Sequence, residues 1–275
     1  MMNMRLHILT PRKGNVDAII KKTFKQINQT FNTWNPKSEI SKLNQLPEYQ
    51  EVEISNELAA MLKRVGEIVE ISGGRFDPTV APLVHMWKTH LKNGEIPKNE
   101  QIEALRPAIG WKNVHLQDNT FYKEHSETQI DLCGIAKGYA VDLLLERLGK
   151  NSYVEWGGEI GTSNRHPSGR LWRVKIFGGG IVEVEDKAVA TSGTYIQKWR
   201  VQNKEYTHLI DPRTLQPLLY GESLVSATVI GESCMDADAF ATTLMFFSTR
   251  EEAEHWAEQL GIEVQLIPYT PDWRD

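Results

Sequence analysis

The sequence predicts an α+β fold in which mainly antiparallel sheets carry flanking helices. Stretches of helical periodicity are spread along the chain, and short alternating apolar and polar stretches lie between them. The strands are joined by hairpins rather than by regular helical crossovers, which favours antiparallel sheet. With 275 residues and 40% hydrophobic content, the chain can bury a sizeable core as one domain over residues 1–275 or as two intimately packed α+β halves.

The predicted elements begin with a strand, because residues 1–14 alternate apolar and polar side chains. Residues 16–31 repeat apolar side chains at helical spacing. A clearer helix follows Ser55, which can cap it, and ends at a pair of glycines. Two more helices are expected over residues 135–148 and 249–260, and Thr249 and Glu252 at the start of the second have the spacing of a capping box.

Strands of period two dominate the second half of the chain. The stretch "LWRVKIFGGGIVEVED" holds two alternating runs around residues 178–180, and no helix follows, so it predicts a β-hairpin rather than a phosphate loop. The stretches "AVAT", "YTHLI" and "LVSATVIG" supply further short strands. No repeat or low-complexity linker marks a domain boundary.

Composition argues against several classes of protein. The formal net charge of −5 disfavours a nucleic-acid-binding protein, which would carry a clustered basic face. Cys133 and Cys234 are too few for a disulfide framework and lack metal-ligand spacing, so we expect reduced thiols. No apolar run approaches the roughly 20 residues of a membrane span, so we expect no transmembrane segment.

A carboxylate and a hydroxyl converge in "SCMDADAFATTLMFF". Ser233 and Asp236 have the spacing of a capping box, which places Asp236 at a helix start. Asp238 and Thr242 are then one turn apart on one helix face. Both are hard oxygen ligands, as Mg²⁺ prefers, and Mg²⁺ completes its octahedron with phosphate and water. The alternative is a buried aspartate that binds neighbouring backbone amides.

Two other stretches can hold a polar ligand. In "DLCGIAKGYAVD", two glycines allow close backbone approach, and Lys137 at a helix N-terminus favours an anion. The alternative is a tight turn with a solvated lysine. In "VATSGT", the hydroxyls of Thr191 and Ser192 either line a ligand or cap a turn.

His208 lies in the alternating stretch "YTHLIDPRT" and is either a structural strand residue or a general base, since its ordinary pKa of about 6.5 permits proton transfer near neutral pH. In "GGRFDPTVAPLVHMW", Phe76, Pro78 and Pro82 form a stiff apolar wall after two glycines. This stretch is either a binding loop or a packed connection.

Taken in order, seven stretches resemble the ApbE family of flavin transferases, which move FMN from FAD onto a protein. They are "FNTWNPKSEISKLN", "GGRFDPTVAPLVHMW", "IDLCGIAKGYAVD", "WGGEIGTS", "AVATSGTY", "THLIDPRT" and "VIGESCMDADAFATTL". They cover most of the chain in family order and spacing. The resemblance implies an ApbE-like fold with FAD in a cleft between two halves.

The resemblance also implies roles for individual residues. Mg²⁺ would bridge the FAD diphosphate to Asp238, Thr242 and the backbone carbonyl of Ala136. His208 would act as the base, and Lys137 would assist at the phosphates; both would also contact FAD. The other positions implied to contact FAD are Trp34, Ser38, Phe76, Asp77, Pro78, Thr191, Ser192, Gly193 and Ile210.

The implied reaction is protein flavinylation. A threonine or serine hydroxyl of an acceptor flavoprotein attacks the FMN phosphorus of FAD, AMP departs, and a phosphoester forms. Two alternatives use the same site: a module that binds or stores FAD without transfer, and an Mg²⁺-dependent FAD pyrophosphatase that gives FMN and AMP. As given, the chain lacks the lipoprotein signal of many relatives, so we expect a cytoplasmic protein, or a periplasmic or membrane-anchored one if that signal was removed.

Three residues depart from the pattern of the family. Glu159 stands where aspartate is usual, Leu215 where glycine is usual after "DPRT", and Cys133 where glycine or serine is common. Glu159 keeps a carboxylate with a longer reach, Leu215 is expected to reshape the turn after His208, and Cys133 adds bulk. None of them removes a residue to which the resemblance assigns a role.

Overall fold

The computed structural model describes residues 4–222 and 224–270, and these form two compact units. The first unit is built from the described residues of segments 1–28, 133–193 and 223–274. The second is built from segments 29–132 and 194–222. Both units combine helices with antiparallel sheets, so the predicted α+β class is confirmed. The implied FAD cleft stays a prediction.

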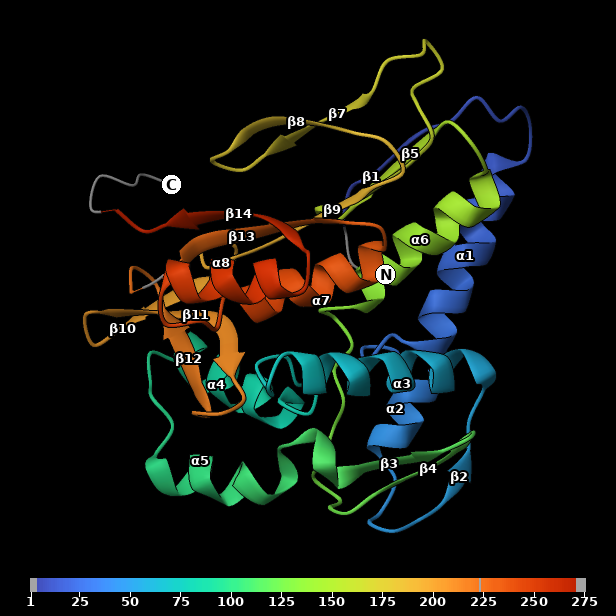
Figure 1. Cartoon of the computed structure of the whole chain (residues 1–275). Helices are drawn as coiled ribbons and strands as arrows, with labels where there is room; N and C mark the ends of the chain where they lie inside the picture. Colours follow the sequence, from blue (N-terminus) through green and yellow to red (C-terminus); the bar gives the residue numbers. More distant parts are fainter. Residues whose placement is uncertain (1–3, 223, 271–275) are drawn as a thin grey trace. The chain divides into compact units, whose positions relative to one another are not determined.

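The first unit is built on a six-stranded sheet (Figure 1). Its strands in spatial order are β1 (Leu6–Leu9), β5 (Ser152–Trp156), β6 (Glu159–Ser163), β9 (Ala188–Gly193), β13 (Leu224–Gly231) and β14 (Glu263–Pro268). All neighbouring strands pair antiparallel. Side chains therefore alternate between two faces of the sheet, and the two faces have different partners.

Helices cover one face of this sheet, and a hairpin covers the other. The helices are α6 (Ala136–Leu148), α7 (Cys234–Leu244) and α1 (Val16–Thr30), whose Phe24 contacts Trp156 of β5, while α8 (Arg250–Gln259) packs beside β14. Gly161 faces α6, since a Cβ there would lie 2.5 Å from Leu145 Cδ1. The neighbouring Ile160 faces the other way, toward the predicted hairpin of β7 (Trp172–Ile176) and β8 (Gly180–Val184).

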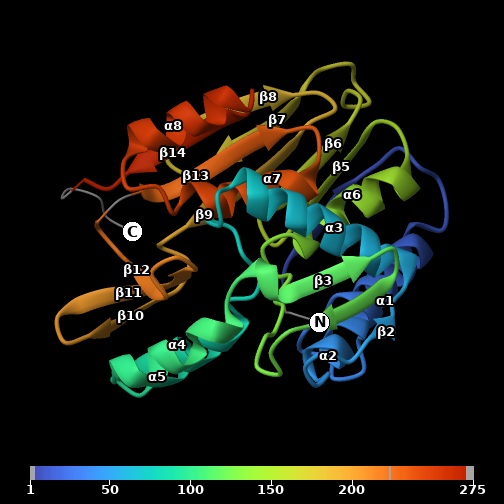
Figure 2. The ribbon, with the colours of Figure 1, turned by 60° about the horizontal axis from the view of Figure 1, so that its bottom comes forward.

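The second unit holds two three-stranded antiparallel sheets. One has the order β2 (Val52–Glu53), β4 (Thr120–Lys123), β3 (Val114–Gln117), and the other has β10 (Lys198–Val201), β11 (Lys204–Asp211), β12 (Gln216–Leu219). The helices of this unit are α2 (Glu39–Asn44), α3 (Asn56–Ile71), α4 (Ala81–Lys92) and α5 (Asn99–Leu105). Helix α3 runs along the sheet of β2, β4 and β3 and contacts β3 (Figure 2). Sequence periodicity identified neither the sheet of β2, β4 and β3 nor the helices α2, α4 and α5, and the end of "GGRFDPTVAPLVHMW", which was expected to be a loop or a connection, forms the start of α4.

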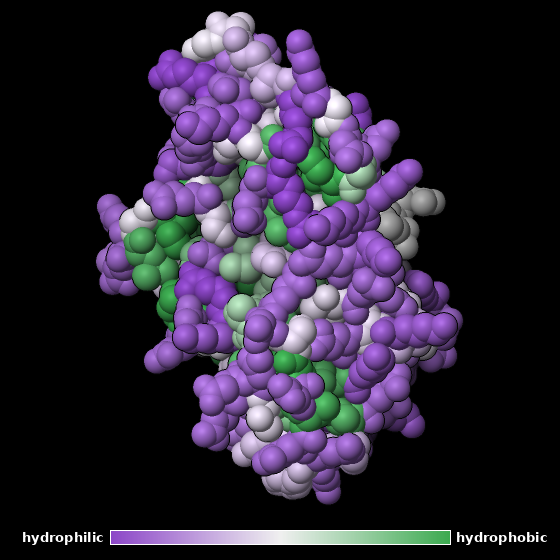
Figure 3. Space-filling model, turned by 90° about the vertical axis from the view of Figure 1, so that its right-hand side faces the viewer, coloured by the Kyte–Doolittle hydropathy of each residue, from purple (hydrophilic) through white to green (hydrophobic). Residues whose placement is uncertain are grey.

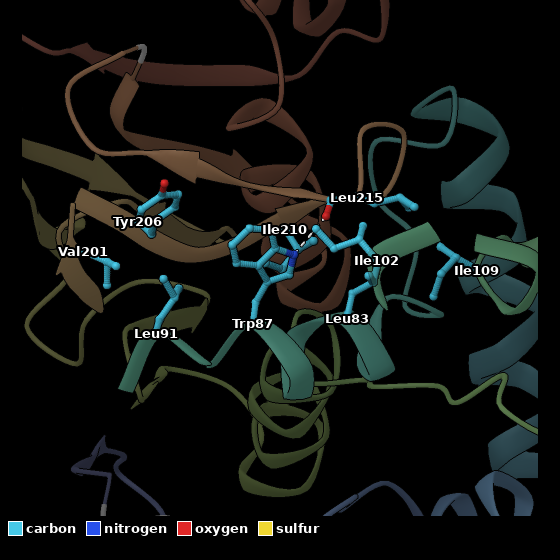
Figure 4. Close-up of a cluster of buried hydrophobic side chains, with 9 residues drawn as sticks. All are labelled: Leu83, Trp87, Leu91, Ile102, Ile109, Val201, Tyr206, Ile210 and Leu215. Carbon is cyan, nitrogen blue, oxygen red and sulfur yellow. Dashed lines mark hydrogen bonds between the residues drawn. The ribbon is translucent and has the colours of Figure 1, made fainter. Parts of the chain in front are cut away.

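A hydrophobic cluster joins α4 to the second sheet of this unit (Figure 4). Its buried residues are Leu83, Trp87, Leu91, Ile102, Ile109, Val201, Tyr206, Ile210 and Leu215. Trp87 Nε1 donates a hydrogen bond to the carbonyl oxygen of Leu215 at 3.0 Å, so its polar edge is satisfied inside the cluster. The cluster thereby fixes the turn after β11, the strand that carries His208.

The predicted helix caps are confirmed. Ser55 Oγ accepts a hydrogen bond from the backbone N–H of Leu58 at 3.2 Å, and Thr249 Oγ1 accepts one from Glu252 at 3.2 Å. These bonds satisfy first-turn amides that have no partner within the helix. Gly73 follows α3 with a φ of +59°, a left-handed conformation that suits glycine at a helix end.

Lys123 is a buried cation that sequence analysis did not single out. Its side chain is 1% exposed, and Nζ donates to the carbonyl oxygens of Asn44, Ser126 and Thr128 at 2.9, 2.9 and 2.8 Å. Burial lowers the pKa of Lys123 to about 8, partly opposed by the charge of Glu127. One ammonium group thus ties β4 to the loop that follows it and to the end of α2.

Hydrophilic side chains cover most of the face in Figure 3, and hydrophobic ones reach it in separate patches. None of the helices within residues 4–222 and 224–270 is both long and apolar enough to cross a membrane.

Replacing Lys123 with methionine should lower the free energy of unfolding by about 2–4 kcal/mol, because three carbonyl oxygens, that of Thr128 buried, lose their donor. Urea denaturation followed by circular dichroism measures the change. Lys63→Met, at an exposed position on α3, is the matched control and should change stability little. Equal stability of the two variants would show that the three bonds contribute nothing.

Candidate functional site

The site in the first unit depends on the close approach of α6 and α7. A Cβ at Gly138 would lie 2.1 Å from the carbonyl oxygen of Cys234 and 2.7 Å from Cα of Met235. These are backbone atoms, so they cannot move aside as the end of a flexible side chain can. Only glycine fits at this crossing, as predicted from "DLCGIAKGYAVD".

Asp142, one turn after Gly138, caps the start of α7. Its Oδ1 accepts from the N–H of Cys234 at 2.9 Å, and its Oδ2 accepts from the N–H of Met235 at 2.9 Å and from Ser233 Oγ at 3.1 Å. Ser233 Oγ in turn accepts from Asp236 N at 3.2 Å, so Ser233 is the predicted N-cap. Burial raises the pKa of Asp142, although these hydrogen bonds oppose the shift.

Three charged side chains meet beside this crossing. Lys137 Nζ donates to Glu159 Oε1 and lies 3.3 Å from Asp238 Oδ1. Asp238 Oδ2 accepts the backbone N–H of Gly138 at 3.2 Å. Asp238 and Glu159 are 3% and 2% exposed, so both carboxylates are buried against one ammonium group.

The surroundings shift all three pKa values upward. Burial, together with the charge of Asp238, raises the pKa of Glu159 to about 8, although Lys137 opposes the shift. Burial also raises the pKa of Asp238, again opposed by Lys137. Burial disfavours the charge on Lys137, but the attraction of both carboxylates outweighs it and raises the pKa. Lys137 therefore stays a cation at neutral pH.

Strand β9 places its two hydroxyl residues on opposite faces of the sheet. Ser192 Oγ lies 2.9 Å from Thr242 Oγ1 on α7, on the helix-covered face. Thr191 Oγ1 lies 2.8 Å from Thr228 Oγ1 on β13, on the other face. Ser192 and Thr242 are therefore neighbours in the structure, whereas the side chain of Thr191 points away from them. Gly193 ends β9 opposite Ser226.

The donors at this site suit Mg²⁺. Within the described part of the chain, no three His, Cys, Asp or Glu side chains gather closely enough to hold a metal ion by themselves. Asp238 and Thr242 lie one turn apart on α7, and Ala136 begins α6 directly before Lys137. One carboxylate, one hydroxyl and one backbone carbonyl form a partial oxygen set that suits an ion completed by phosphate and water.

Ser38 and Asp77 in the second unit were predicted to contact FAD, and their side chains form hydrogen bonds within their own loops. Ser38 is fully buried as the N-cap of α2, where its Oγ accepts from Ser41 N at 3.2 Å. Asp77 accepts from Thr79 N, Thr79 Oγ1 and Trp111 N at 2.9, 2.6 and 2.8 Å. Burial raises the pKa of Asp77, and these bonds oppose the shift. Both side chains shape their loops.

Three further predicted contacts are apolar and buried. Phe76 is 5% exposed and Pro78 is also buried, so the wall that they form packs inward as a connection. Ile210 belongs to the hydrophobic cluster of Figure 4. Contact of these residues with FAD stays a prediction.

Trp34 differs from them, because its side chain is 69% exposed. Lys88 Nζ lies 5.9 Å from the centre of its ring, within the range of a cation–π contact. An exposed aromatic face next to a cation is suited to a planar, anionic ligand.

His208 lies where the pairing of β11 with β12 is irregular, and its side chain is partly buried. Its Nδ1 lies 3.3 Å from the carbonyl oxygen of Gln197. A carbonyl can only accept, so this contact favours the tautomer with the proton on Nδ1 and the lone pair on Nε2. In that tautomer Nε2 can accept a proton.

The departures from the family pattern have clear structural settings. Leu215 adopts a left-handed backbone with a φ of +61°, yet its side chain is 1% exposed inside the hydrophobic cluster. Its N–H donates to Asp211 O at 2.8 Å, so the turn closes as a glycine turn would. Cys133 and Cys234 are reduced thiols, as predicted. Glu159 is the acidic partner of Lys137.

Comparisons with known proteins agree with this arrangement. Residues 2–266 match the sequence profile of the ApbE family. An FAD:protein FMN transferase of Chlamydia pneumoniae is 44% identical over 254 residues, which cover 90% of this chain and 81% of that protein. One of Vibrio cholerae is 32% identical over 92% of this chain and 79% of its own length. The solved flavin transferase ApbE from Vibrio cholerae superposes with a TM-score of 0.85 at 30% identity, covering 98% of this chain and 92% of that one.

Asp142→Ala should lower the free energy of unfolding by about 1–3 kcal/mol, because the first turn of α7 loses its cap. Asp142→Asn keeps an acceptor oxygen and should lose less. Chemical denaturation measures both, with Glu146→Ala on the exposed side of α6 as the control. An alanine variant as stable as the control would contradict the capping role.

Leu215→Gly and Leu215→Ala separate strain from burial at the turn after β11. Both lose a buried leucine, at a cost of about 3–5 kcal/mol. Glycine also relieves the left-handed backbone, which costs leucine or alanine about 1 kcal/mol. We therefore expect both variants to be less stable than the parent chain, with the glycine variant about 1 kcal/mol more stable than the alanine variant. The reverse order in urea denaturation would mean that the turn carries no strain.

Proposed function

Because this chain belongs to the ApbE family, we propose that it is an FAD:protein FMN transferase. The acceptor is a threonine or serine hydroxyl of a flavoprotein, the reaction depends on Mg²⁺, and AMP is released. The observation that carries this proposal is the buried carboxylate of Asp238, which lies one helical turn from the hydroxyl of Thr242 and is neutralised by Lys137. A buried carboxylate that is paired with a cation and lies beside a hydroxyl is a candidate for holding a metal ion and an anionic ligand.

Mg²⁺ would be held by Asp238, Thr242 and the backbone carbonyl of Ala136. When bound, it supplies a Lewis acid for the phosphate oxygens of FAD. Ser192 supports this role, because its hydroxyl lies within hydrogen-bond distance of Thr242 and can orient the oxygen lone pairs of Thr242.

The start of α6 is suited to the FAD diphosphate. Helix α7 is capped by Ser233 and Asp142, whose carboxylate repels an anion at that end. Helix α6 begins after Ile135, which has no side-chain oxygen to cap it, and carries Lys137 in its first turn. Amides and an ammonium group at a helix N-terminus stabilise phosphate oxygens.

His208 is proposed as the base. The acceptor hydroxyl is a weak nucleophile until its proton is removed, and the lone pair on Nε2 can take that proton. A bond then forms between the hydroxyl oxygen and the FMN phosphorus, and the bond from this phosphorus to the AMP oxygen breaks. Lys137 stabilises negative charge on the phosphate oxygens during this step.

The test is incubation of the purified chain with FAD, MgCl₂ and a protein carrying a threonine or serine acceptor motif. Flavin fluorescence on a denaturing gel measures transfer. We expect a fluorescent acceptor band that disappears with EDTA and that weakens roughly 100-fold or more in Asp238→Asn and in His208→Gln. Asp17→Asn and His85→Gln, at exposed positions, are the matched controls.

The same experiment separates the other two candidates. Bound FAD without a labelled acceptor, for a second acceptor as well, would indicate an FAD-binding or storage module. FMN and AMP formed without any acceptor would indicate a pyrophosphatase. Either outcome in place of a labelled acceptor would overturn the proposal.

A further inference from the structure

Glu159 is a buried carboxylate whose polar partner in the structure is Lys137. Its Oε1 accepts from Lys137 Nζ, and its Oε2 has no hydrogen-bond partner among the described residues. The side chain is 2% exposed. Burial of a charge with one oxygen unsatisfied is costly, so its function has to be sought in its effect on Lys137.

Lys137 is shared between Glu159 and Asp238. Its Nζ lies 3.3 Å from Asp238 Oδ1, the carboxylate that we propose as a metal ligand. An ammonium group there partly neutralises Asp238 and repels any second cation that approaches the same oxygen. The carboxylate of Glu159 attracts the same ammonium group and competes with Asp238 for it. The balance between the two contacts therefore sets how readily a metal ion can reach Asp238.

On the basis of the proposed function, we propose that Lys137 is a built-in counter-ion that occupies Asp238 before Mg²⁺ binds, and that Glu159 is a positioning residue that retains the ammonium group when Mg²⁺ takes its place. Cation exchange of this kind keeps the buried carboxylates neutralised in both states. It also keeps Lys137 close to the start of α6, where it can contact phosphate oxygens once it has left Asp238.

Substitutions of Lys137 and of Glu159 should then change the Mg²⁺ affinity in opposite directions. Lys137→Met removes the competing cation and leaves two carboxylates, so Mg²⁺ should bind more tightly. Glu159→Gln removes the group that retains the ammonium, so Lys137 pairs with Asp238 alone and Mg²⁺ should bind more weakly. A purely structural ion pair predicts the same direction for both variants, because each would disrupt the same site.

The experiment is thermal unfolding of the full chain against MgCl₂ concentration, which gives an apparent dissociation constant without turnover. It is run at pH 8.5. We expect roughly tenfold tighter binding in Lys137→Met and roughly tenfold weaker binding in Glu159→Gln. Glu159→Asp keeps the charge and should stay closer to the parent chain than Glu159→Gln. Glu183→Gln, on the exposed side of β8, removes one charge elsewhere and should change nothing.

Lys137→Gln serves as a second variant in case the methionine variant does not fold, since its amide can still donate to a carboxylate. Weaker binding in every folded Lys137 variant, or unchanged binding in Glu159→Gln, would overturn the inference. If the parent chain shows no Mg²⁺ stabilisation and no FMN transfer, the proposed function fails and the inference fails with it. If the parent chain binds Mg²⁺ and transfers FMN, but the Lys137 and Glu159 variants change the Mg²⁺ affinity in the same direction, only the inference fails.

Discussion

The contact between α6 and α7 at Gly138 is the constraint on which the rest of the site depends. Because no Cβ intervenes, the amide of Gly138 reaches Asp238, and Asp142 reaches the first turn of α7. Any side chain at this position would push the two helices apart and break both contacts. The absence of a Cβ at Gly138 therefore controls how Asp238 and Asp142 are placed beside Lys137, and the six-stranded sheet supplies Glu159 from β6.

Local signals in the sequence identified much of the fold and part of the site. Caps such as Ser55, Ser233 and Thr249 depend on residues within one turn, so their spacing alone located three helix starts. The pairing of Asp238 with Thr242 has the same origin, because i and i+4 positions share a helix face. The sequence also predicted correctly that Gly138 lies where two backbone segments approach closely.

The remaining features depend on pairings between distant segments, which periodicity does not encode. Lys123 is unremarkable in sequence, and only the fold brings three carbonyl oxygens to it. Thr191 and Ser192 formed one motif, yet a strand turns neighbouring side chains to opposite faces, and the strand register decides which face meets α7. Asp77 and Ser38 were assigned to FAD by resemblance, and their loops engage both in internal hydrogen bonds.

The order of segments in the first unit has a consequence for how the protein is made. Its sheet takes strands from three separate parts of the chain, and β13, α7 and β14 come from the last of them. On the ribosome, Lys137 and Glu159 emerge with Asp142 long before Asp238 and the amides of α7. Until then Asp142 lacks the amides that it caps, and the ion pair of Lys137 and Glu159 lacks the carboxylate of Asp238, so early burial of these charges is unfavourable. Closure of this unit is therefore a late step of synthesis, and a chain that lacks the segment from β13 onward would lose two strands of the sheet together with the proposed metal ligands Asp238 and Thr242.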